Sequence, residues 1–287
     1  MVRAVRTLPS LVLLIALLVP TTAWGASRSD RIEATYGIGN IENGTASWTD
    51  RELKIVEASL RILDEAELRG VQGVKLVRMK RSPRIAGTGL YLVDGEGPRI
   101  LIYDRAFKGP GKGSPKVPNQ TLVHEFGHAI AHKTVRAATR RAERAVDEAN
   151  ALVDKYNAAV GRYNALARRW NQTRDRAVKD EMVPVGRRIR RLEGDIVEIR
   201  REVRKLNRKA RELHSDHNSP FPRSGVLRDY KVALGLRFGP TPYGRRNLQE
   251  SFAESFMLHK TDRKTLKKRL PKVAKWLQAD GHLNPTR

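Results

Sequence analysis

Two long runs of regularly spaced apolar residues constrain this chain more than any other feature of its sequence. In both runs the apolar positions alternate three and four residues apart, which is the spacing by which supercoiled α-helices keep one face against a partner. The first run comprises Ala138, Ala142, Ala145, Ala149, Leu152, Tyr156, Ala159, Tyr163, Leu166, Trp170, Thr173 and Ala177. The second run comprises Ile189, Leu192, Ile196, Ile199, Val203, Leu206, Ala210 and Leu213.

Pro184 and Gly186 lie between the two runs, and both residue types weaken a helix interior. We therefore predict an antiparallel coiled-coil hairpin over residues 134–214, with its turn at these two residues and its first arm longer than its second. At about 1.5 Å per residue, the arms would be several tens of ångströms long. Charged residues fill the outer positions, as expected of a solvated coiled coil, and their basic surplus could also bind a polyanion.

The amino terminus has the pattern of a secretory signal peptide over residues 1–25. Arg3 and Arg6 precede an uninterrupted apolar run at residues 11–19, and Ala23 and Gly25 supply small residues at the usual cleavage spacing. A permanent membrane anchor is the weaker alternative, because a span needs about 20 apolar residues. We expect an exported protein, periplasmic or secreted, whose mature chain starts near Ala26 with a flexible lead-in over residues 26–48.

Composition limits the partners and the chemistry. The chain has 56 Lys and Arg residues against 31 Asp and Glu residues, a formal net charge of +25, so a polyanionic partner such as nucleic acid, lipid headgroups or an acidic envelope polymer is plausible. Cysteine is absent. This excludes disulfides, thiol catalysis and cysteine-rich zinc folds, so any metal site must use His, Asp or Glu.

The segments on either side of the hairpin predict a small α+β domain, split into residues 49–133 and 215–287. Thr49 and Glu52 form a capping box at the start of an apolar helical pattern. The expected elements are a helix at 50–65, a strand at 74–79, a β-hairpin of 89–93 with 100–103, a returning loop at 215–242, and closing helices at 247–260 and 262–280, the last interrupted at Pro271. The loop at 108–118 contains Gly-Lys-Gly-Ser, which lacks the ending of a phosphate-binding loop, so we expect no nucleotide.

The motif with the most chemical content is His124-Glu125-Phe126-Gly127-His128, an H-E-x-x-H match on a helix expected to start near Asn119 or Thr121. The two imidazoles lie one helical turn apart, so both can reach one zinc ion at about 2.0–2.1 Å. Glu125 projects beside the metal and not at it, which suits a base for the activated water. The ion would lower the pKa of that water toward about 7, and the hydroxide left after Glu125 takes its proton would attack a carbonyl.

A catalytic zinc site needs a third protein ligand and an open position. His132 lies two helical turns beyond His124, about 12 Å along a straight helix, so we expect it to be a supporting or surface residue. His214 and His217 follow the hairpin in a polar stretch and are expected to lie in a solvated loop. Glu250 and Glu254 are better placed, one turn apart on a helix that Phe252, Phe256 and Met257 would anchor in the core.

The His124–Ala129 motif, followed by Tyr243-Gly244-Arg245-Arg246-Asn247 and by Glu250–Phe256, resembles the catalytic domain of anthrax lethal factor and its relatives, which include the Pro-Pro endopeptidases. This resemblance to a zincin family implies that His124, His128 and Glu250 bind zinc and that Glu125 is the base. It also implies that Tyr243, seven residues before Glu250, assists the oxyanion. Glu254 would then orient a metal-binding imidazole.

The resemblance implies an exported zinc metalloendopeptidase with one Zn²⁺ per chain, acting on a peptide or protein substrate. The hairpin lies between the two metal-binding segments, where the family pattern is much shorter. An antiparallel hairpin returns its second arm to within about 8–10 Å of its first, so an insertion of this kind leaves Glu250 able to reach the site.

A second hypothesis is a non-catalytic scaffold on a degenerate zincin body, which binds a polyanionic or envelope partner through the basic coiled coil. The net charge and the uninterrupted heptads motivate it. Binding of that kind should weaken steeply with salt and survive chelation, whereas peptidase activity should vanish with a chelator and return with zinc.

Overall fold

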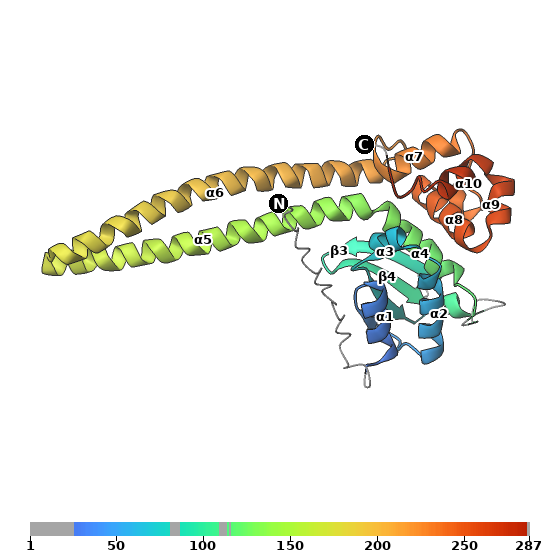
Figure 1. Ribbon diagram of the computed structural model, residues 1–287, viewed down its shortest axis with the longest axis horizontal. Coiled ribbons are helices and arrows are strands. Elements are labelled where there is room, and N and C mark those ends of the chain that lie inside the picture. Colours follow the sequence, from blue (N-terminus) through green and yellow to red (C-terminus); the bar gives the residue numbers. More distant parts are fainter. Residues whose placement is uncertain (1–25, 81–86, 109–113, 115, 286–287) are drawn as a thin grey trace, which may run out of the picture.

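A long two-helix hairpin projects from a mixed α+β body in the computed structural model (Figure 1). The structure describes residues 26–80, 87–108, 114 and 116–285, so the signal-peptide prediction and part of the 108–118 loop lie outside the described residues. Its elements are α1 (Arg28–Tyr36), β1 (Ile41–Asn43), α2 (Asp50–Arg61), α3 (Glu65–Val71), β2 (Lys75–Met79), β3 (Gly89–Asp94), β4 (Gly97–Tyr103), η1 (Asp104–Phe107), α4 (Gln120–Ala131), α5 (Lys133–Thr173), α6 (Arg176–His217), α7 (Gly225–Leu234), η2 (Tyr243–Arg245), α8 (Leu248–Thr261), α9 (Arg263–Arg269) and α10 (Pro271–Gln278).

The antiparallel hairpin is formed by α5 and α6, but its turn is not where the sequence predicted it. Arg174 ends α5 in the left-handed conformation, with φ of 53°, and its N–H donates to the Trp170 carbonyl at 2.8 Å. Asp175 then caps α6 by accepting from the Ala177 N–H at 2.9 Å. The predicted turn at Pro184 and Gly186 is therefore wrong. The prediction of a longer first arm is also wrong, because the arms have 41 and 42 residues.

Packing explains why α6 runs through Pro184. Val178, Met182 and Val185 extend the spacing of the second apolar run back to the turn, and the two valines are buried with Leu166. Pro184 itself is exposed, and a Cβ added to Gly186 would meet the Tyr163 ring at 3.6 Å, so this glycine is part of the helix contact. Core contacts on both sides of the proline offset its missing backbone hydrogen bond.

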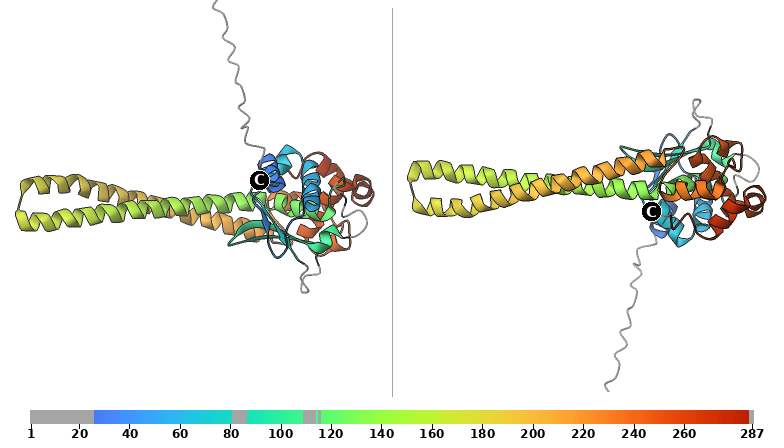
Figure 2. Two further views of the ribbon diagram at one scale, coloured as in Figure 1. Left: turned by 90° about the horizontal axis from the view of Figure 1, so that it is seen from below. Right: turned by 90° about the horizontal axis from the view of Figure 1, so that it is seen from above.

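The two arms stay together along their whole length. At about 1.5 Å per residue each spans about 60 Å, and the views in Figure 2 show them crossing as they run outward. Ala142, Ala145, Ala159, Leu192 and Ile196 from the predicted runs are buried. The heptad prediction of the contact face is thus confirmed for both arms except at Tyr163, Thr173 and Ala177, which are exposed, and Ala177 lies on α6 and not on the first arm.

Residues 26–48 are ordered, so the predicted flexible lead-in is wrong. Ser27 and Asp30 form a capping box at the start of α1, and Ile32 is buried in the core. Arg28 pairs with Asp50 at 2.6 Å and with Glu57 at 2.9 Å, which fixes α1 against α2. The small polar residues that suggested mobility therefore serve as caps and turns.

The sheet has four strands in the order β1-β2-β4-β3. β1 and β4 lie on either side of β2 and pair with it in parallel, while β3 pairs antiparallel with β4 as the predicted hairpin and forms an edge strand.

Two further boundaries differ from the predictions. The helix expected to reach residue 65 ends at Arg61, because Asp64 caps α3, and the expected loop at 215–242 contains the end of α6 and all of α7, whose apolar face is buried. The closing helices and the break at Pro271 are confirmed.

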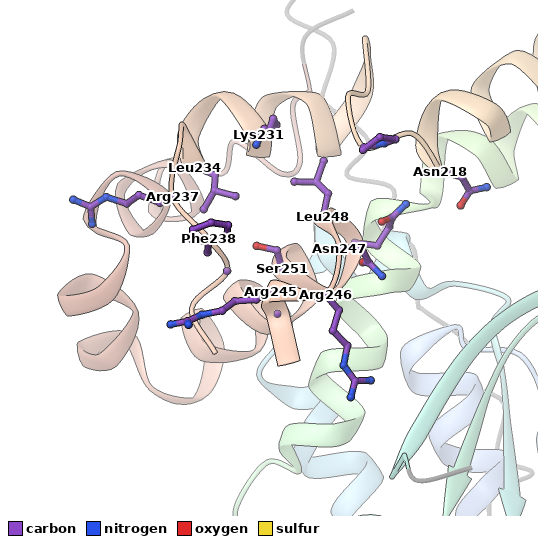
Figure 3. Close-up of a pocket in the computed structure, with 14 residues that line it drawn as sticks. Asn218, Lys231, Leu234, Arg237, Phe238, Arg245, Arg246, Asn247, Leu248 and Ser251 are labelled. Atoms are coloured by element: carbon purple, nitrogen blue, oxygen red, sulfur yellow. The ribbon is translucent and has the colours of Figure 1, made fainter. Parts of the chain in front are cut away.

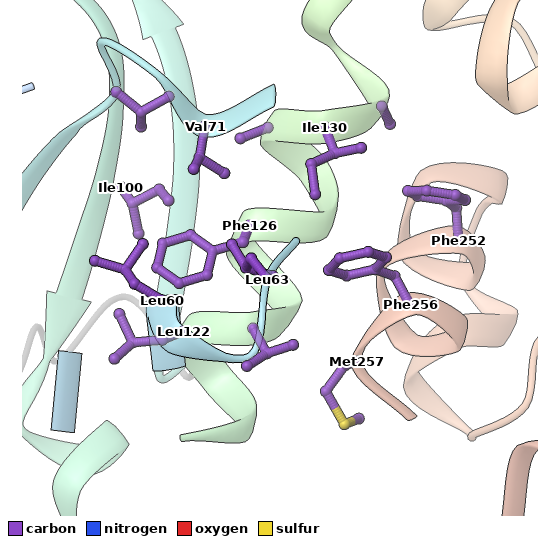
Figure 4. Close-up of a cluster of buried hydrophobic side chains, with 14 of the residues drawn as sticks. Leu60, Leu63, Val71, Ile100, Leu122, Phe126, Ile130, Phe252, Phe256 and Met257 are labelled. Atoms are coloured by element: carbon purple, nitrogen blue, oxygen red, sulfur yellow. The ribbon is translucent and has the colours of Figure 1, made fainter. Parts of the chain in front are cut away.

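Helix α4 is the centre of the body. Figure 4 shows Leu122 and Phe126 on its sheet side, near residues of α2, α3 and β4, and Phe252 and Phe256 of α8 on its other side, while Ile130 packs against Gly70 of α3. All five side chains are at most 2% exposed. The helix that carries the H-E-x-x-H motif is therefore held between two apolar layers.

The hairpin grows directly from α4, because only His132 separates the end of α4 from the start of α5. Buried Arg136 donates to the Ala129 carbonyl at 3.1 Å and to the Gly70 carbonyl, which ties the first turn of α5 to α3 and α4. At the other arm, His217 ends α6 with its ring 4.6 Å from the His132 ring. The hairpin therefore leaves the body and returns to it at adjacent points.

The described chain contains no helix that is both long enough and apolar enough to span a bilayer.

The observed turn predicts opposite outcomes from those of a turn at the proline. Pro184→Ala should raise the free energy of unfolding by about 2 kcal/mol, because alanine restores a hydrogen bond inside α6. Arg174→Gly should raise it by up to about 1 kcal/mol, because glycine adopts the left-handed conformation without a Cβ penalty. Urea unfolding followed by circular dichroism measures both. A Pro184→Ala protein that unfolds more easily than wild type would place the turn back at the proline.

Candidate metal centre

The H-E-x-x-H segment lies on α4, which begins where the sequence predicted. Asn119 caps the helix by accepting from the Leu122 N–H at 3.1 Å. The Asn119 backbone N–H donates to the Ser59 hydroxyl at 2.8 Å, and its side-chain amide donates to the Ala106 carbonyl at 2.8 Å. These buried contacts fix the start of α4, and hence the direction in which its histidines project.

The second half of the centre lies on α8. Asn247 caps this helix by accepting from the Glu250 N–H at 2.8 Å, so Glu250 occupies the first turn. The buried hydroxyl of Tyr230 contacts Ser251 Oγ at 2.6 Å and Ser255 Oγ at 2.9 Å, one turn apart on the face of α8 next to the one that carries Glu250 and Glu254. Helix α7 thereby sets the rotation that directs Glu250 and Glu254 toward α4.

The two helices approach closely at a glycine. A Cβ added to Gly127 would lie 3.1 Å from the Cα of Ala253 and 3.3 Å from the Phe256 ring. A contact at 3.1 Å is tighter than ordinary van der Waals packing, so the glycine inside the motif permits a helix separation that a larger residue would not. This close packing brings side chains 126 residues apart in the sequence into contact.

Three ligand atoms meet between the helices. His124 Nε2 lies 3.0 Å from Glu250 Oε2, His128 Nε2 lies 3.2 Å from the same oxygen, and the two nitrogens are 3.1 Å apart. Ligands held tetrahedrally at 2.0–2.1 Å from zinc are separated from one another by about 3.3 Å. The triangle is therefore the right size for one ion, and these residues form a group able to hold a metal among the described side chains.

Glu254 supports this triangle from behind, at the position expected of it. Its Oε1 lies 2.8 Å from His124 Nδ1, on the side of the imidazole away from the other ligands. The Thr241 hydroxyl donates to Glu254 Oε2 at 2.5 Å and accepts from the Gly244 N–H at 3.0 Å. A carboxylate in this position fixes the ring orientation and increases the basicity of the metal-binding nitrogen. Thr241 was not anticipated, because nothing in the Pro-Thr-Pro segment marks it.

Glu125 is brought to the centre without joining the ligand triangle. Its side chain is 5% exposed and lies against β3, where a Cβ added to Gly89 would come within 2.7 Å of its Oε1. Burial raises the pKa of Glu125, and this effect outweighs the attraction of the two histidines. A carboxylate whose pKa is raised toward neutrality is a better general base at physiological pH.

Tyr243 lies at the edge of the same site, on η2. Its hydroxyl donates to Glu250 Oε1 at 3.4 Å, and its ring centroid lies 5.7 Å from that of His124. The Arg246 guanidinium sits 4.4 Å from the centre of the Tyr243 ring. Partial burial and the nearby carboxylates raise the pKa of Tyr243, so the phenol stays protonated and able to donate.

The electrostatics of the triangle favour a protonated His124 beside an ionised Glu250. Burial alone would lower the pKa of His124, but its contacts with Glu250 and Glu254 raise that pKa to about 10. In turn the histidines hold the pKa of Glu250 far below its usual range, despite the burial of that carboxylate. A proton on His124 thus offsets the negative charge that a divalent cation would otherwise balance.

The remaining histidines behave differently from one another. His132 is buried outside the ligand triangle, as its distance along the helix predicted, and its Nδ1 lies 3.2 Å from the hydroxyl of Tyr91, whose ring stacks on that of His128 with centroids 6.5 Å apart. His214 is exposed, as expected, but it lies on α6 and not in a loop. His217 is half-buried against His132, so its prediction as a solvated loop residue is wrong. Sequence reasoning missed Tyr91, whose strand composition carries no sign of this contact.

A cleft of about 470 Å³ opens onto the centre. It is bordered by Gly87, Thr88 and Gly89 on one side and by Met257 and Leu258 on the other, with His124, Glu125 and Tyr243 in its wall. The residues that could react are therefore accessible from solvent through a space large enough for several side chains.

Zinc binding should release about one proton per ion near pH 8, because a ligating imidazole must be neutral and His124 is protonated in the metal-free state. The pKa of His124 is raised on folding, so its charged form stabilises the metal-free protein fully below about pH 6.5, and this stabilisation is lost as pH rises through about 10. Zinc affinity should therefore rise with pH across that window. Calorimetry in buffers of different ionisation enthalpy counts the protons.

The matched variant is Glu254→Gln, which removes one of the two carboxylates that raise the pKa of His124. It should release fewer protons at the same pH. Equal heats of zinc binding in all buffers, after correction for dilution, would contradict a protonated His124.

Comparisons with protein-family models, with curated proteins and with solved structures found no match for this chain.

Proposed function

We propose that this chain is an exported zinc metalloendopeptidase whose catalytic domain is zincin-like. The observation that carries the proposal is the meeting of His124, His128 and Glu250 in a triangle of zinc-ligand size, with Glu125 beside it. Separate stretches of the chain supply these groups, and a purely structural helix pair has no need of such an arrangement. The accessible cleft beside the triangle further supports a substrate site.

Each residue has a role that follows from its position. A zinc ion would supply the Lewis acid that polarises the scissile carbonyl and acidifies the attacking water. His124, His128 and Glu250 would hold the ion, and Glu254 would keep the His124 ring in orientation. Glu125 would take the proton from the water and pass it to the departing amine, a task suited to its raised pKa.

Tyr243 would act on the charge that develops on the carbonyl oxygen. Its hydroxyl lies within reach of Glu250 and the residue is 40% exposed, so the phenol can turn toward a bound substrate. A hydrogen bond to an oxyanion strengthens as charge accumulates, which lowers the barrier more than it tightens substrate binding. Arg246, stacked on the Tyr243 ring, favours the donation because a nearby positive charge makes the phenol more acidic.

Glu125→Gln tests the mechanism directly. The variant should retain zinc, because Glu125 is not in the ligand triangle, but should cleave a mixed peptide pool about a thousandfold more slowly, because it lacks a general base. Mass spectrometry of the digest and metal analysis of the protein provide the two measurements. Glu212→Gln on the exposed face of α6 is the matched control and should cleave at the wild-type rate. Wild-type cleavage by a zinc-loaded Glu125→Gln protein would refute the mechanism.

A second candidate function is binding of a polyanion by the hairpin. One observation favours it: within the fully described arms, the lysines and arginines from Arg140 to Arg211 form no ion pair with a carboxylate. Positive charges that are not neutralised within the protein remain available to phosphate or sulfate groups. Such binding could accompany peptidase activity or replace it.

Polyphosphate binding at increasing salt concentrations tests this second function. The triple variant Arg200→Gln, Arg201→Gln, Arg204→Gln should bind more weakly and show a shallower salt dependence, because fewer counterions are released. The control replaces Lys264, Lys268 and Lys272 by glutamine, which removes the same charge from the body. Equal losses in the two variants would assign the binding to net charge and not to the hairpin.

A further inference from the structure

A second hollow lies directly behind the segment that carries Tyr243 and Glu250. It has a volume of about 290 Å³ and is enclosed by α7, by the chain from Arg237 to Gly239, and by the residues that lead from η2 into α8 (Figure 3). Gln249 and Ser251, the immediate neighbours of Glu250, are part of its wall. The hollow and the metal centre thus lie on two sides of one short stretch of chain.

The charge of this hollow is entirely positive. Lys231, Arg237, Arg245 and Arg246 line it, and none of its lining residues is an aspartate or a glutamate. No carboxylate in the described part of the chain forms an ion pair with any of these four cations. Like charges gathered without a counter-charge repel one another, so the arrangement favours an anionic ligand.

Arg246 connects the hollow with the catalytic residues. Its guanidinium stacks on the Tyr243 ring at 4.4 Å from the ring centre. Figure 3 shows Arg246 extending on the side of α4, while Arg237 and Arg245 extend toward the outer side of the hollow. A peptide substrate bound at the metal would therefore pass Arg246 before it reached the other cations.

The basic hollow has no counterpart among the described residues of the cleft that opens onto the centre. Those lining residues include no lysine or arginine, and their ionisable groups are those of the catalytic site. A substrate that crosses the centre would thus meet a basic surface on one side and, among the described residues, none on the other. Such asymmetry selects the position of an acidic residue as well as its presence.

The hollow also has an apolar part. Leu234 and Leu248 are buried at its base, and Phe238 beside them is 75% exposed. A free inorganic anion gains nothing from such a surface, whereas a peptide segment places apolar atoms against it while its carboxylates pair with the rim.

From these observations we infer that the peptidase prefers substrates with acidic side chains on one side of the scissile bond, and that the hollow at Lys231, Arg237, Arg245 and Arg246 binds them. The claim that the bound peptides are substrates rests on the proposed function. The claim that the hollow binds acidic peptides rests only on the charge and the apolar surface of the hollow.

Binding without cleavage provides the test. Two pools of fluorescein-labelled octapeptides share mixed sequences but differ at two fixed positions, which carry glutamate in one pool and glutamine in the other. Anisotropy is measured with full-length mature protein in the presence of a chelator, so that no peptide is cut. The acidic pool should bind about fivefold more tightly than the amide pool, the gain expected from two exposed ion pairs.

The hollow variant is Lys231→Gln, Arg245→Gln, which leaves Arg246 and its contact with Tyr243 in place. The control is Lys264→Gln, Lys272→Gln, which loses the same charge at two exposed lysines of the body that do not line the hollow. The ratio of the affinities for the acidic and amide pools should fall to nearly one in the hollow variant and remain about fivefold in the control. Unchanged thermal unfolding of both variants ensures that folding is not the cause.

Three results would overturn the assignment: equal binding of the two pools by wild type, equal losses in the hollow variant and the control, or complete competition by millimolar inorganic phosphate. The second would indicate attraction by net charge, and the third an inorganic anion site. Digestion of both pools by the zinc-loaded protein tests the proposed function separately. Cleavage without an acidic preference would reject only the hollow, whereas acidic binding without cleavage would reject only the peptidase.

Discussion

The close packing of α4 against α8 at Gly127 and Ala253 is the contact on which the candidate metal centre depends. His124 and His128 project from one helix and Glu250 from the other, so the distance between their ligand atoms is set by the distance between the helix axes. Apolar side chains on both faces of α4 hold that distance. The packing of the core therefore affects the chemistry directly. A change of one ångström in the distance between the two helices would change the distances between the ligand atoms by a similar amount.

Charge balance is the second constraint on the centre. Glu125, Glu250 and Glu254 lie around two imidazoles in a largely buried space, where unpaired carboxylates are costly. The metal-free protein meets this cost with a proton on His124 and a raised pKa on Glu125. A divalent cation would take the place of that proton, so metal binding, proton release and the basicity of Glu125 are parts of one equilibrium.

The hairpin illustrates how far a periodic pattern can be trusted. The alternation of three and four residues predicted both arms and their contact faces, but a helix-breaking proline and a glycine suggested a turn ten residues from the real one, at Arg174 and Asp175. Val185, Met182 and Val178 continue the second run backward to the turn without a break in spacing. The packing of a continuous apolar seam outweighed the local preference of one exposed proline. The prediction that residues 26–48 are flexible was wrong for a related reason. Helix caps and turns use the same small polar residues as flexible segments.

The sequence by itself determined the two helical arms, the β-hairpin, the helix that bears His124, Glu125 and His128, and the pairing of Glu250 with Glu254, because each depends on periodicity or spacing within a short stretch of chain. Only the tertiary structure decided that Glu250 meets the histidines and that Glu254 contacts His124 through its Nδ1 side. It also decided that Thr241, Tyr91 and the cations around Arg245 gather near them. Those contacts join residues far apart in the chain, and their distances follow from how α4, α7 and α8 pack, which no local pattern encodes.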